Sequence, residues 1–250
     1  MTRPAARSSQ AAAGPGAAAA LLVWSGAILF VVSLGYFLYS YAVRFGEPAR
    51  GTGIAFPTLV NLGLFTAFAL HHSALARSGP KAWLTRFVPC YLERSLYTIV
   101  SSLLFIAVCA AWRPVTGVLY EVTGIWAFAG YVVQIAGILL TAHGARAIDV
   151  LDLAGVRPFL LASRGTPPRH VPLETRGVYA IVRHPVYLAW ALLVFGSPVM
   201  TGTRAVFALV STAYLALAIP FEERGLVETF GHEYEVYRQR VRWRMIPGVY

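Results

Sequence analysis

The stretch Arg176-Gly-Val-Tyr-Ala-Ile-Val-Arg-His-Pro-Val-Tyr187 stands where a long polar connection gives way to the last apolar part of the chain. Pro185 has a fixed φ and no N–H, so it predicts the first turn of a helix. The apolar segments 186–200 and 204–220 follow, separated by Thr201-Gly-Thr203, which can end one helix and begin the next. This pattern predicts a helical hairpin that returns the chain to the side where the hairpin began.

Composition places the whole chain in a membrane. Of the 250 residues, 57% are hydrophobic and 13% are charged, whereas soluble domains carry about 25% charged residues. The mean hydropathy is +0.61. Because so few charged side chains cannot cover a water-facing surface, we predict an all-α polytopic membrane protein. The formal net charge of +10 is then better explained by membrane topology and contact with membrane lipids than by nucleic-acid binding.

The apolar segments predict about six transmembrane helices. A bilayer core of roughly 30 Å is crossed by about 20 apolar residues in a helix. Segments of this length lie at 18–43, 54–76, 95–112 and 124–144. The two hairpin arms hold about 15 and 17 residues and would cross only a thinned part of the bilayer. Residues 77–94, which mix charged and aromatic side chains, predict an amphipathic surface segment.

The distribution of Lys and Arg orients these spans. With six spans, the N-terminus, the loop at 77–94, the connection at 145–183 and the tail lie on one side and hold 17 Lys and Arg residues, whereas the opposite loops hold 4. Cytoplasmic loops are enriched in Lys and Arg. The sequence therefore predicts an integral protein of a bacterial-type inner membrane with both termini in the cytoplasm.

The hairpin brings two carboxylates next to the opening stretch. Glu222 and Glu223 follow the second arm, so they should lie beside Arg183 and His184. Charged groups at membrane depth are costly unless they are paired or functional. These groups could simply form ion pairs that anchor helix ends. They could also hold a zwitterionic ligand, with Arg183 and His184 binding its carboxylate and a glutamate binding its ammonium or hydroxyl groups.

The motifs of this region resemble a known superfamily. Tyr179-x-x-x-Arg183-His184-Pro185-x-Tyr187, Glu222-Glu223, Phe230-Gly-x-x-Tyr234-x-x-Tyr237 and Ile246-Pro247 are similar to the integral-membrane methyltransferases, which include isoprenylcysteine carboxyl methyltransferases and phospholipid N-methyltransferases. The resemblance covers roughly residues 145–250. It implies S-adenosylmethionine as the cofactor, and it implies cofactor binding by Tyr179, Arg183, His184, Pro185, Tyr187, Glu222 and Glu223.

The N-terminal half resembles one branch of that superfamily. His72-Ser73-x-x-Ala76-Arg77, Glu93-Arg94-Ser95-x-Tyr97 and Trp112-Arg113-Pro114 are similar to the branch of NnrU-like proteins and bacterial methanethiol S-methyltransferases. That branch has an Asn-His pair where this chain has Asp149-Val150. The resemblance implies methyl transfer to a small or apolar thiol such as methanethiol. The alternatives are methylation of an isoprenylcysteine carboxyl group or a phospholipid headgroup, or a non-catalytic membrane sensor or assembly protein.

Four residues are candidates for the acceptor side of such a reaction. A thiol reacts as its thiolate, and His72, near the end of the second span, could accept the thiol proton. His143, near the end of the fourth span, is a second candidate, and either histidine could instead be a structural hydrogen-bonding group. Glu93 and Arg94 could form an ion pair that fixes the third span, or could contact the substrate.

These expectations divide the chain into three regions. Residues 1–17, rich in Ala, Ser, Pro and Gly, predict a disordered N-terminus, and the apolar run after them is too long for a cleaved signal peptide. Residues 18–144 form a four-helix transmembrane region, and residues 145–250 form a cofactor-binding region with the hairpin and the tail. We expect no metal site, because Asp149 and Asp152 have no further carboxylate or histidine nearby.

Overall fold

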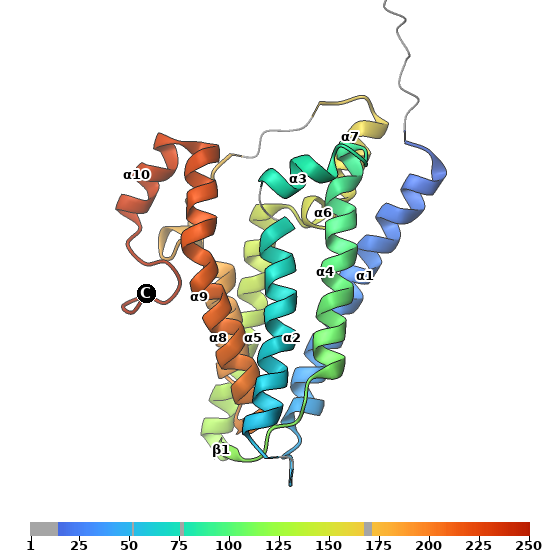
Figure 1. Ribbon diagram of the computed structural model, residues 1–250. Helices are drawn as coiled ribbons and strands as arrows, with labels where there is room; N and C mark the ends of the chain where they lie inside the picture. Colours follow the sequence, from blue (N-terminus) through green and yellow to red (C-terminus); the bar gives the residue numbers. More distant parts are fainter. Residues whose placement is uncertain (1–14, 52, 76–77, 168–171) are drawn as a thin grey trace, which may run out of the picture.

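The structure, a computed structural model, describes residues 15–51, 53–75, 78–167 and 172–250. Its regular structure is almost entirely helical, with long helices packed side by side (Figure 1). The long helices are α1 (Ala17–Ala42), α2 (Ala55–Leu75), α4 (Cys90–Ala111), α5 (Gly124–Ile148) and α9 (Gly202–Phe230). The short ones are α3 (Ser78–Leu84), α6 (Val150–Leu153), α7 (Val156–Ser163), α8 (Pro185–Phe195) and α10 (His232–Arg240), with 3-10 turns at η1 (Arg44–Gly46) and η2 (Gly177–Ala180). Residues 1–14 of the predicted N-terminal region lie outside the described residues.

Five of the described helices are long and apolar enough to cross a membrane, namely α1 extended through η1, α2, α4, the first 21 residues of α5, and α9. Their outer faces carry large apolar side chains, and Leu21, Phe56 and Trp126 are 74%, 74% and 72% exposed. Such surfaces match lipid chains and would be costly in water. The predicted all-α polytopic membrane fold is confirmed, and the chain is an integral membrane protein.

The sixth apolar segment is shorter than the arm predicted at 186–200. Helix α8 ends at Phe195 after 11 residues, a length of about 16 Å. Gly196 caps it, and Pro198 disfavours helical geometry at the residue before it. The chain then continues as strand β2 (Val199–Thr201), which pairs antiparallel with β1 (Val118–Glu121). This small sheet, which the sequence did not predict, lies at the end of the bundle away from α10 (Figure 1).

Regularly spaced glycines of α5 allow α8 to pack closely against it. Gly130, Gly137 and Gly144 recur at every seventh residue of α5. A Cβ added at Gly137 would lie 2.7 Å from the Ala189 carbonyl oxygen, and one at Gly130 would lie 2.7 Å from the Gly196 carbonyl oxygen. Small residues allow membrane helices to approach closely, because packing rather than water exclusion drives their association. The repeat therefore determines where α8 begins and where the residues before it lie.

Helix α9 is longer than predicted. The arm expected at 204–220 continues through Pro220 to Phe230, so Glu222 and Glu223 lie inside the helix rather than after it. Proline cannot donate the N–H that would bond the carbonyl four residues earlier. That carbonyl belongs to Ala216, and the Tyr250 hydroxyl donates to it at 3.3 Å. A contact from the end of the chain thus satisfies the acceptor that Pro220 leaves unbonded.

The structure also differs from the surface segment that the sequence predicted at residues 77–94. Helix α4 begins at Cys90, so Glu93 and Arg94 belong to its first turns, and α3 takes up residues 78–84. The polar connection after α5 folds onto this part of α4 through α6 and α7. Ser95 Oγ donates to the Gly155 carbonyl at 3.1 Å, and Thr98 Oγ1 donates to the Leu153 carbonyl at 3.0 Å. These bonds hold the connection against the bundle.

The bundle core is aromatic. The Phe37 ring stacks on Trp190 with 4.8 Å between centroids and on Phe207 with 5.5 Å. Phe65 and Trp112 complete this group, which joins α1, α2, α8, α9 and the end of α4. Large rings bury much apolar area with few rotatable bonds. The core therefore holds α8 and α9 in fixed positions relative to each other.

Arg44 and Arg204 lie at the end of the bundle that is poor in basic residues, and both bind backbone carbonyls. Arg204 donates to the carbonyls of Tyr41, Ala42 and Val199 at 2.8–3.0 Å. Arg44 donates to the Cys109 carbonyl at 3.1 Å, where α4 ends. Carbonyls at helix C-termini have no helical partner and carry partial negative charge. The two arginines therefore join elements at this end of the bundle.

Candidate functional site

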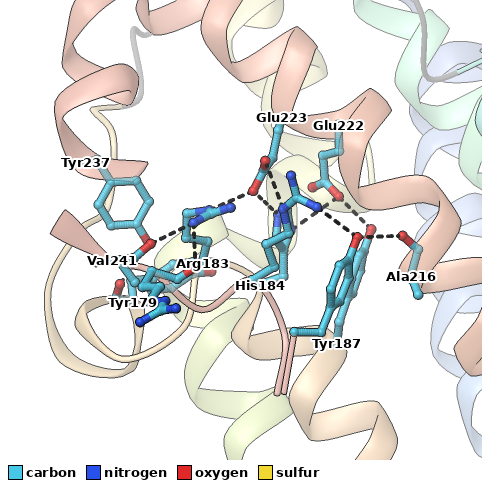
Figure 2. A network of polar contacts seen from close by, with 12 residues as sticks. Tyr179, Arg183, His184, Tyr187, Ala216, Glu222, Glu223, Tyr237 and Val241 are labelled. Carbon is cyan, nitrogen blue, oxygen red and sulfur yellow. Dashed lines mark hydrogen bonds and ion pairs between the residues drawn. The ribbon is translucent and has the colours of Figure 1, made fainter. Parts of the chain in front are cut away.

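The predicted polar cluster forms where the chain enters α8. Pro185 is the first residue of α8, as predicted, and His184 is its N-cap. The tail after α10 runs back beside this entry. Arg183 N donates to the Trp243 carbonyl at 2.9 Å, and His184 N donates to the Arg244 carbonyl at 2.8 Å. These two bonds fix both side chains between the tail and α9 (Figure 2).

Arg183 and Glu223 form a buried ion pair. Nε of Arg183 lies 2.7 Å from Oε1 of Glu223, and both side chains are 7% exposed. Arg183 also donates to the carbonyls of Val241 and Arg242, at 2.7 and 3.1 Å. Buried charges are costly unless they are paired and further hydrogen-bonded, and this pair meets both conditions. Its geometry joins α9, the α8 entry and the tail.

His184 lies between the two glutamates. Its Nδ1 is 3.5 Å from Glu222 Oε2 and its Nε2 is 3.4 Å from Glu223 Oε1, and the side chain is 5% exposed. Nε2 has no hydrogen bond of good geometry to any described residue. The ring stacks on Tyr187 with 5.3 Å between centroids. A buried ring nitrogen without such a bond is available for a hydrogen bond to a ligand.

Glu222 differs from its neighbour in exposure. Its side chain is 46% exposed, and it accepts a hydrogen bond from the Tyr187 hydroxyl at 2.6 Å (Figure 2). Adjacent residues on a helix point about 100° apart, so one carboxylate enters the protein and the other faces open space. Glu222 therefore retains oxygen lone pairs that a polar ligand could use.

Tyr179 and Tyr237 connect η2 to α10. The Tyr237 hydroxyl donates to the Tyr179 carbonyl at 2.7 Å. Burial raises the pKa of Tyr237 to about 12, so this phenol stays protonated and able to donate. Burial, together with the negative charges of Glu174 and Glu222, raises the pKa of Tyr179. The structure thus brings the half-buried Tyr179 ring to the edge of the cluster.

The end of the chain packs over the same cluster. Arg244 Nε lies 3.5 Å from Glu223 Oε2, and its NH1 donates to the Tyr250 hydroxyl at 3.1 Å. Met245 packs with Ala191 and Ile219, and Tyr187 and Tyr250 border this group. The sequence did not single out Arg244 or Tyr250. The sequence pattern that could have identified them is the alternation of Arg with aromatic residues in the tail. That pattern is equally typical of a membrane-surface anchor.

The acceptor-side candidates fall into two groups. His72 pairs with Tyr97 of α4, whose hydroxyl lies 2.8 Å from His72 Nδ1. Arg94 lies 3.7 Å from Asp152 in α6, and Glu93 stands one residue before it in the first turn of α4. His143 is on the exposed side of α5. The structure therefore brings His72, but not Arg94, into a polar pair inside the bundle.

Two hydroxyl groups beside His72 were not anticipated. Ser73 Oγ lies 2.7 Å from the hydroxyl of Tyr214, which comes from α9. Tyr214 interrupts an apolar span, and polar side chains in spans usually face the bundle interior. That interruption is the signal by which the sequence could have identified it.

An open groove of about 480 Å³ lies between α5 and α8 and extends toward the end of the bundle that carries β1. Leu188, Ala191 and Leu192 line it, together with Ile246 of the tail. The predicted cofactor residues do not line it. It is an apolar space, separate from the charged face of α9.

Known proteins share this region. The family model "Phospholipid methyltransferase" matches residues 125–233, which include every predicted cofactor residue. Methanethiol S-methyltransferase 2 of Bradyrhizobium diazoefficiens is 36% identical over 217 residues, covering 86% of this chain and 83% of that protein.

Two further relatives have similar names. The methanethiol S-methyltransferase of Crocosphaera subtropica is 38% identical over 190 residues, with 73% and 72% of the two chains covered. That of Mycobacterium tuberculosis is 32% identical over 226 residues, with 86% and 90% covered. No solved structure matches this chain significantly.

Proposed function

This chain belongs to the family of integral-membrane methyltransferases that contains the methanethiol S-methyltransferases, and from that premise we propose that it transfers a methyl group from S-adenosylmethionine to methanethiol. The observation that carries the proposal is the cluster at the α8 entry. There the buried Nε2 of His184 lies 3.4 Å from Glu223 Oε1 but has no hydrogen bond of good geometry to any described residue. Nδ1 of the same ring lies 3.5 Å from the half-exposed carboxylate of Glu222. These groups fit a ligand that carries a carboxylate, an ammonium and hydroxyl groups.

Different residues of the cluster would bind different groups of this cofactor. His184 would bind its carboxylate, and Glu222 would accept hydrogen bonds from its ammonium or ribose hydroxyls. Tyr179 and Tyr187 offer aromatic faces to the purine or the sulfonium. When bound, S-adenosylmethionine supplies an electrophilic methyl group on sulfur. The protein then has to position donor and acceptor and exclude water.

Arg183, Glu223 and Pro185 would act by positioning the others. Arg183 already contacts one carboxylate and two carbonyls, so it has little capacity left for a ligand. The Arg183–Glu223 pair instead holds His184 and the tail together, and Pro185 fixes the turn into α8. The tail from Val241 to Tyr250 packs over the cluster and would exclude water from the bound cofactor.

We also propose that this end of the molecule faces the cytoplasm. The side predicted to hold 17 of the 21 Lys and Arg residues carries the cluster, α3, α7 and α10. The four remaining arginines include Arg44 and Arg204, whose bonds to backbone carbonyls give them a structural reason to lie at the other end. Both termini would then be cytoplasmic, where S-adenosylmethionine is made.

Calorimetric binding of S-adenosylhomocysteine to the detergent-purified protein tests the donor site. We expect saturable binding by the wild type that is lost in His184→Ala and Glu222→Gln. Glu228→Gln, at an exposed position on the same helix, should bind like the wild type. A folded wild type that does not bind S-adenosylhomocysteine would refute the proposal.

Product analysis tests the acceptor. Membranes given methanethiol and S-adenosylmethionine should release dimethyl sulfide, measured in the gas above the sample, and Glu222→Gln should abolish the release. If label from the methyl donor appears instead in a phospholipid or a prenylated cysteine peptide, one of the lipid-like acceptors is correct. Cofactor binding with no methylated product from any of the three would favour a non-catalytic membrane protein.

A further inference from the structure

His72 and Tyr97 form a hydrogen-bonded pair inside the bundle, away from the charged cluster. The Tyr97 hydroxyl lies 2.8 Å from His72 Nδ1 and 3.3 Å from the His72 carbonyl. The His72 ring stacks on Phe68 with 5.5 Å between centroids. Both side chains are partly buried, and the Tyr97 hydroxyl also lies 3.2 Å from His72 Nε2. A phenol beside an imidazole can pass its proton to the imidazole nitrogen.

Electrostatic interactions connect the pair to the donor cluster, by which we mean Tyr179, Arg183, His184, Tyr187, Glu222 and Glu223 at the α8 entry. Tyr214, held by Ser73 at 2.7 Å, lies next to the pair on the α9 side. Tyr97 and Tyr214 are both close enough to Tyr187 to interact with it electrostatically, and Tyr214 interacts likewise with Glu222. Polar groups from α2, α4, α8 and α9 thus converge within an apolar bundle, and such groups are retained in spans mainly for function.

We propose that Tyr97 and His72 are the proton relay for the thiol acceptor, an inference that rests on the proposed function. The Tyr97 oxygen takes the S–H proton of methanethiol while the Tyr97 hydroxyl proton passes to His72 Nδ1. This leaves a thiolate, a neutral phenol and an imidazolium. The thiolate sulfur then forms its bond to the donor's methyl carbon with its own electron pair. The bond from that carbon to the donor's sulfur breaks, and its electrons stay on the donor.

Tyr97 has both groups that such a relay requires. The phenol has one proton to donate to His72 and lone pairs to accept from the thiol. The titratable and charged groups that interact with the pair are His71 on α2, Glu93 and Arg94 on α4, Tyr214 on α9 and Tyr187 on α8. Glu222 on α9 interacts with Tyr187 and Tyr214 rather than with the pair itself.

The test compares His72→Asn, Tyr97→Phe and the double variant in the full-length protein. Each single variant should lose about 10²-fold in kcat/KM for methanethiol at neutral pH, the usual contribution of general-base catalysis. The loss should shrink as the pH rises, because alkaline solution supplies the thiolate directly. The double variant should be no slower than either single variant, since residues that act as a unit have non-additive effects.

Matched controls separate the relay from general damage. His232→Asn, where the side chain is 88% exposed, and Tyr131→Phe, on the lipid-facing side of α5, should keep the wild-type rate and pH profile. All relay variants should bind S-adenosylhomocysteine like the wild type, because neither residue belongs to the donor cluster. If His72→Asn does not fold, the kcat/KM and pH profile of Tyr97→Phe alone test the relay, because that variant removes only one oxygen.

The relay is refuted if the single variants keep the wild-type kcat/KM and pH profile. It is equally refuted if their losses multiply in the double variant. These results leave the proposed function standing, because the wild type still makes dimethyl sulfide. A wild type that binds no S-adenosylhomocysteine, or makes no dimethyl sulfide, refutes the proposed function instead.

Discussion

Glu222 and Glu223 are neighbours in the sequence but occupy opposite environments. Glu223 is buried against Arg183, His184 and Arg244, whereas Glu222 is half exposed and bonded to Tyr187. Helix geometry alone separates the two carboxylates, because residues one position apart point in different directions. The same chemical group therefore stabilises the fold at one position and is available to a ligand at the next.

This difference predicts stability losses of different size for two matched substitutions. Glu223→Gln leaves the Arg183 guanidinium buried without its counter-charge, so it should destabilise the protein by about 3–5 kcal/mol. Glu222→Gln should change stability by less than about 1 kcal/mol, as expected for an exposed group. Denaturant unfolding in detergent measures both. Equal stability losses in the two variants would contradict the assignment of Glu223 as the structural member.

At the scale of single elements, α8 is defined by its contact with α5. Its 11 residues are too few to cross the bilayer, and its entry at His184 lies where Gly137 and Gly144 let the two helices approach. The position of the donor cluster therefore depends on glycines of a helix that supplies none of the predicted cofactor residues.

Gly137→Ala should separate α8 from α5. The added Cβ would meet the Ala189 carbonyl at 2.7 Å and Leu193 N at 2.9 Å, an overpacking that typically costs about 1–3 kcal/mol. S-adenosylhomocysteine affinity should fall as the α8 entry shifts. Gly63→Ala in α2 is the matched control, because a Cβ there has no atom within 4 Å. The helix-to-helix explanation is wrong if both variants bind the ligand equally.

The end of α9 shows how one element depends on another. Pro220 predicts a helix end, because proline removes a backbone donor. The helix nevertheless continues for ten residues, with Tyr250 bonded to the freed Ala216 carbonyl. The tail and the end of α9 therefore support each other, and both contribute to the donor cluster.

At the scale of the whole molecule, the two ends of the bundle differ in chemistry. One end carries the donor cluster, α10 and most of the basic residues. The other has the small sheet and arginines bound to carbonyls. This asymmetry is the basis for the orientation proposed above, in which the end with the cluster faces the cytoplasm.

Native cysteine labelling tests that orientation. Cys90 is exposed at the cytoplasmic end proposed here, and Cys109 is buried. A membrane-impermeant maleimide should label Cys90 in inside-out vesicles but not in intact cells. In a Cys90→Ser protein, Glu121→Cys places a thiol at the opposite end, in β1, and should reverse the pattern. Labelling of Cys90 in intact cells would invert the proposed topology.

The parts of this protein that depend on local chemistry could be predicted from its sequence. Apolar length identified the long spans, and Pro185 marked the start of α8, because both properties act within a few residues. The return of the hairpin was also enough to place Glu222 and Glu223 near Arg183 and His184. That prediction needed only the direction of the chain and no side-chain detail.

By itself, the sequence determined an all-α membrane protein with Arg183, His184, Glu222 and Glu223 at one end, because hydropathy and helix length leave few other arrangements. Only the tertiary structure decided which glutamate is buried, where α8 and α9 end, and that His72 meets Tyr97. Each of these depends on contacts between residues far apart in the chain: Arg183 with Glu223, Tyr250 with Ala216, and α2 with α4. A helical pattern states which residues share a face, but the packing of the neighbouring helices decides what each face meets.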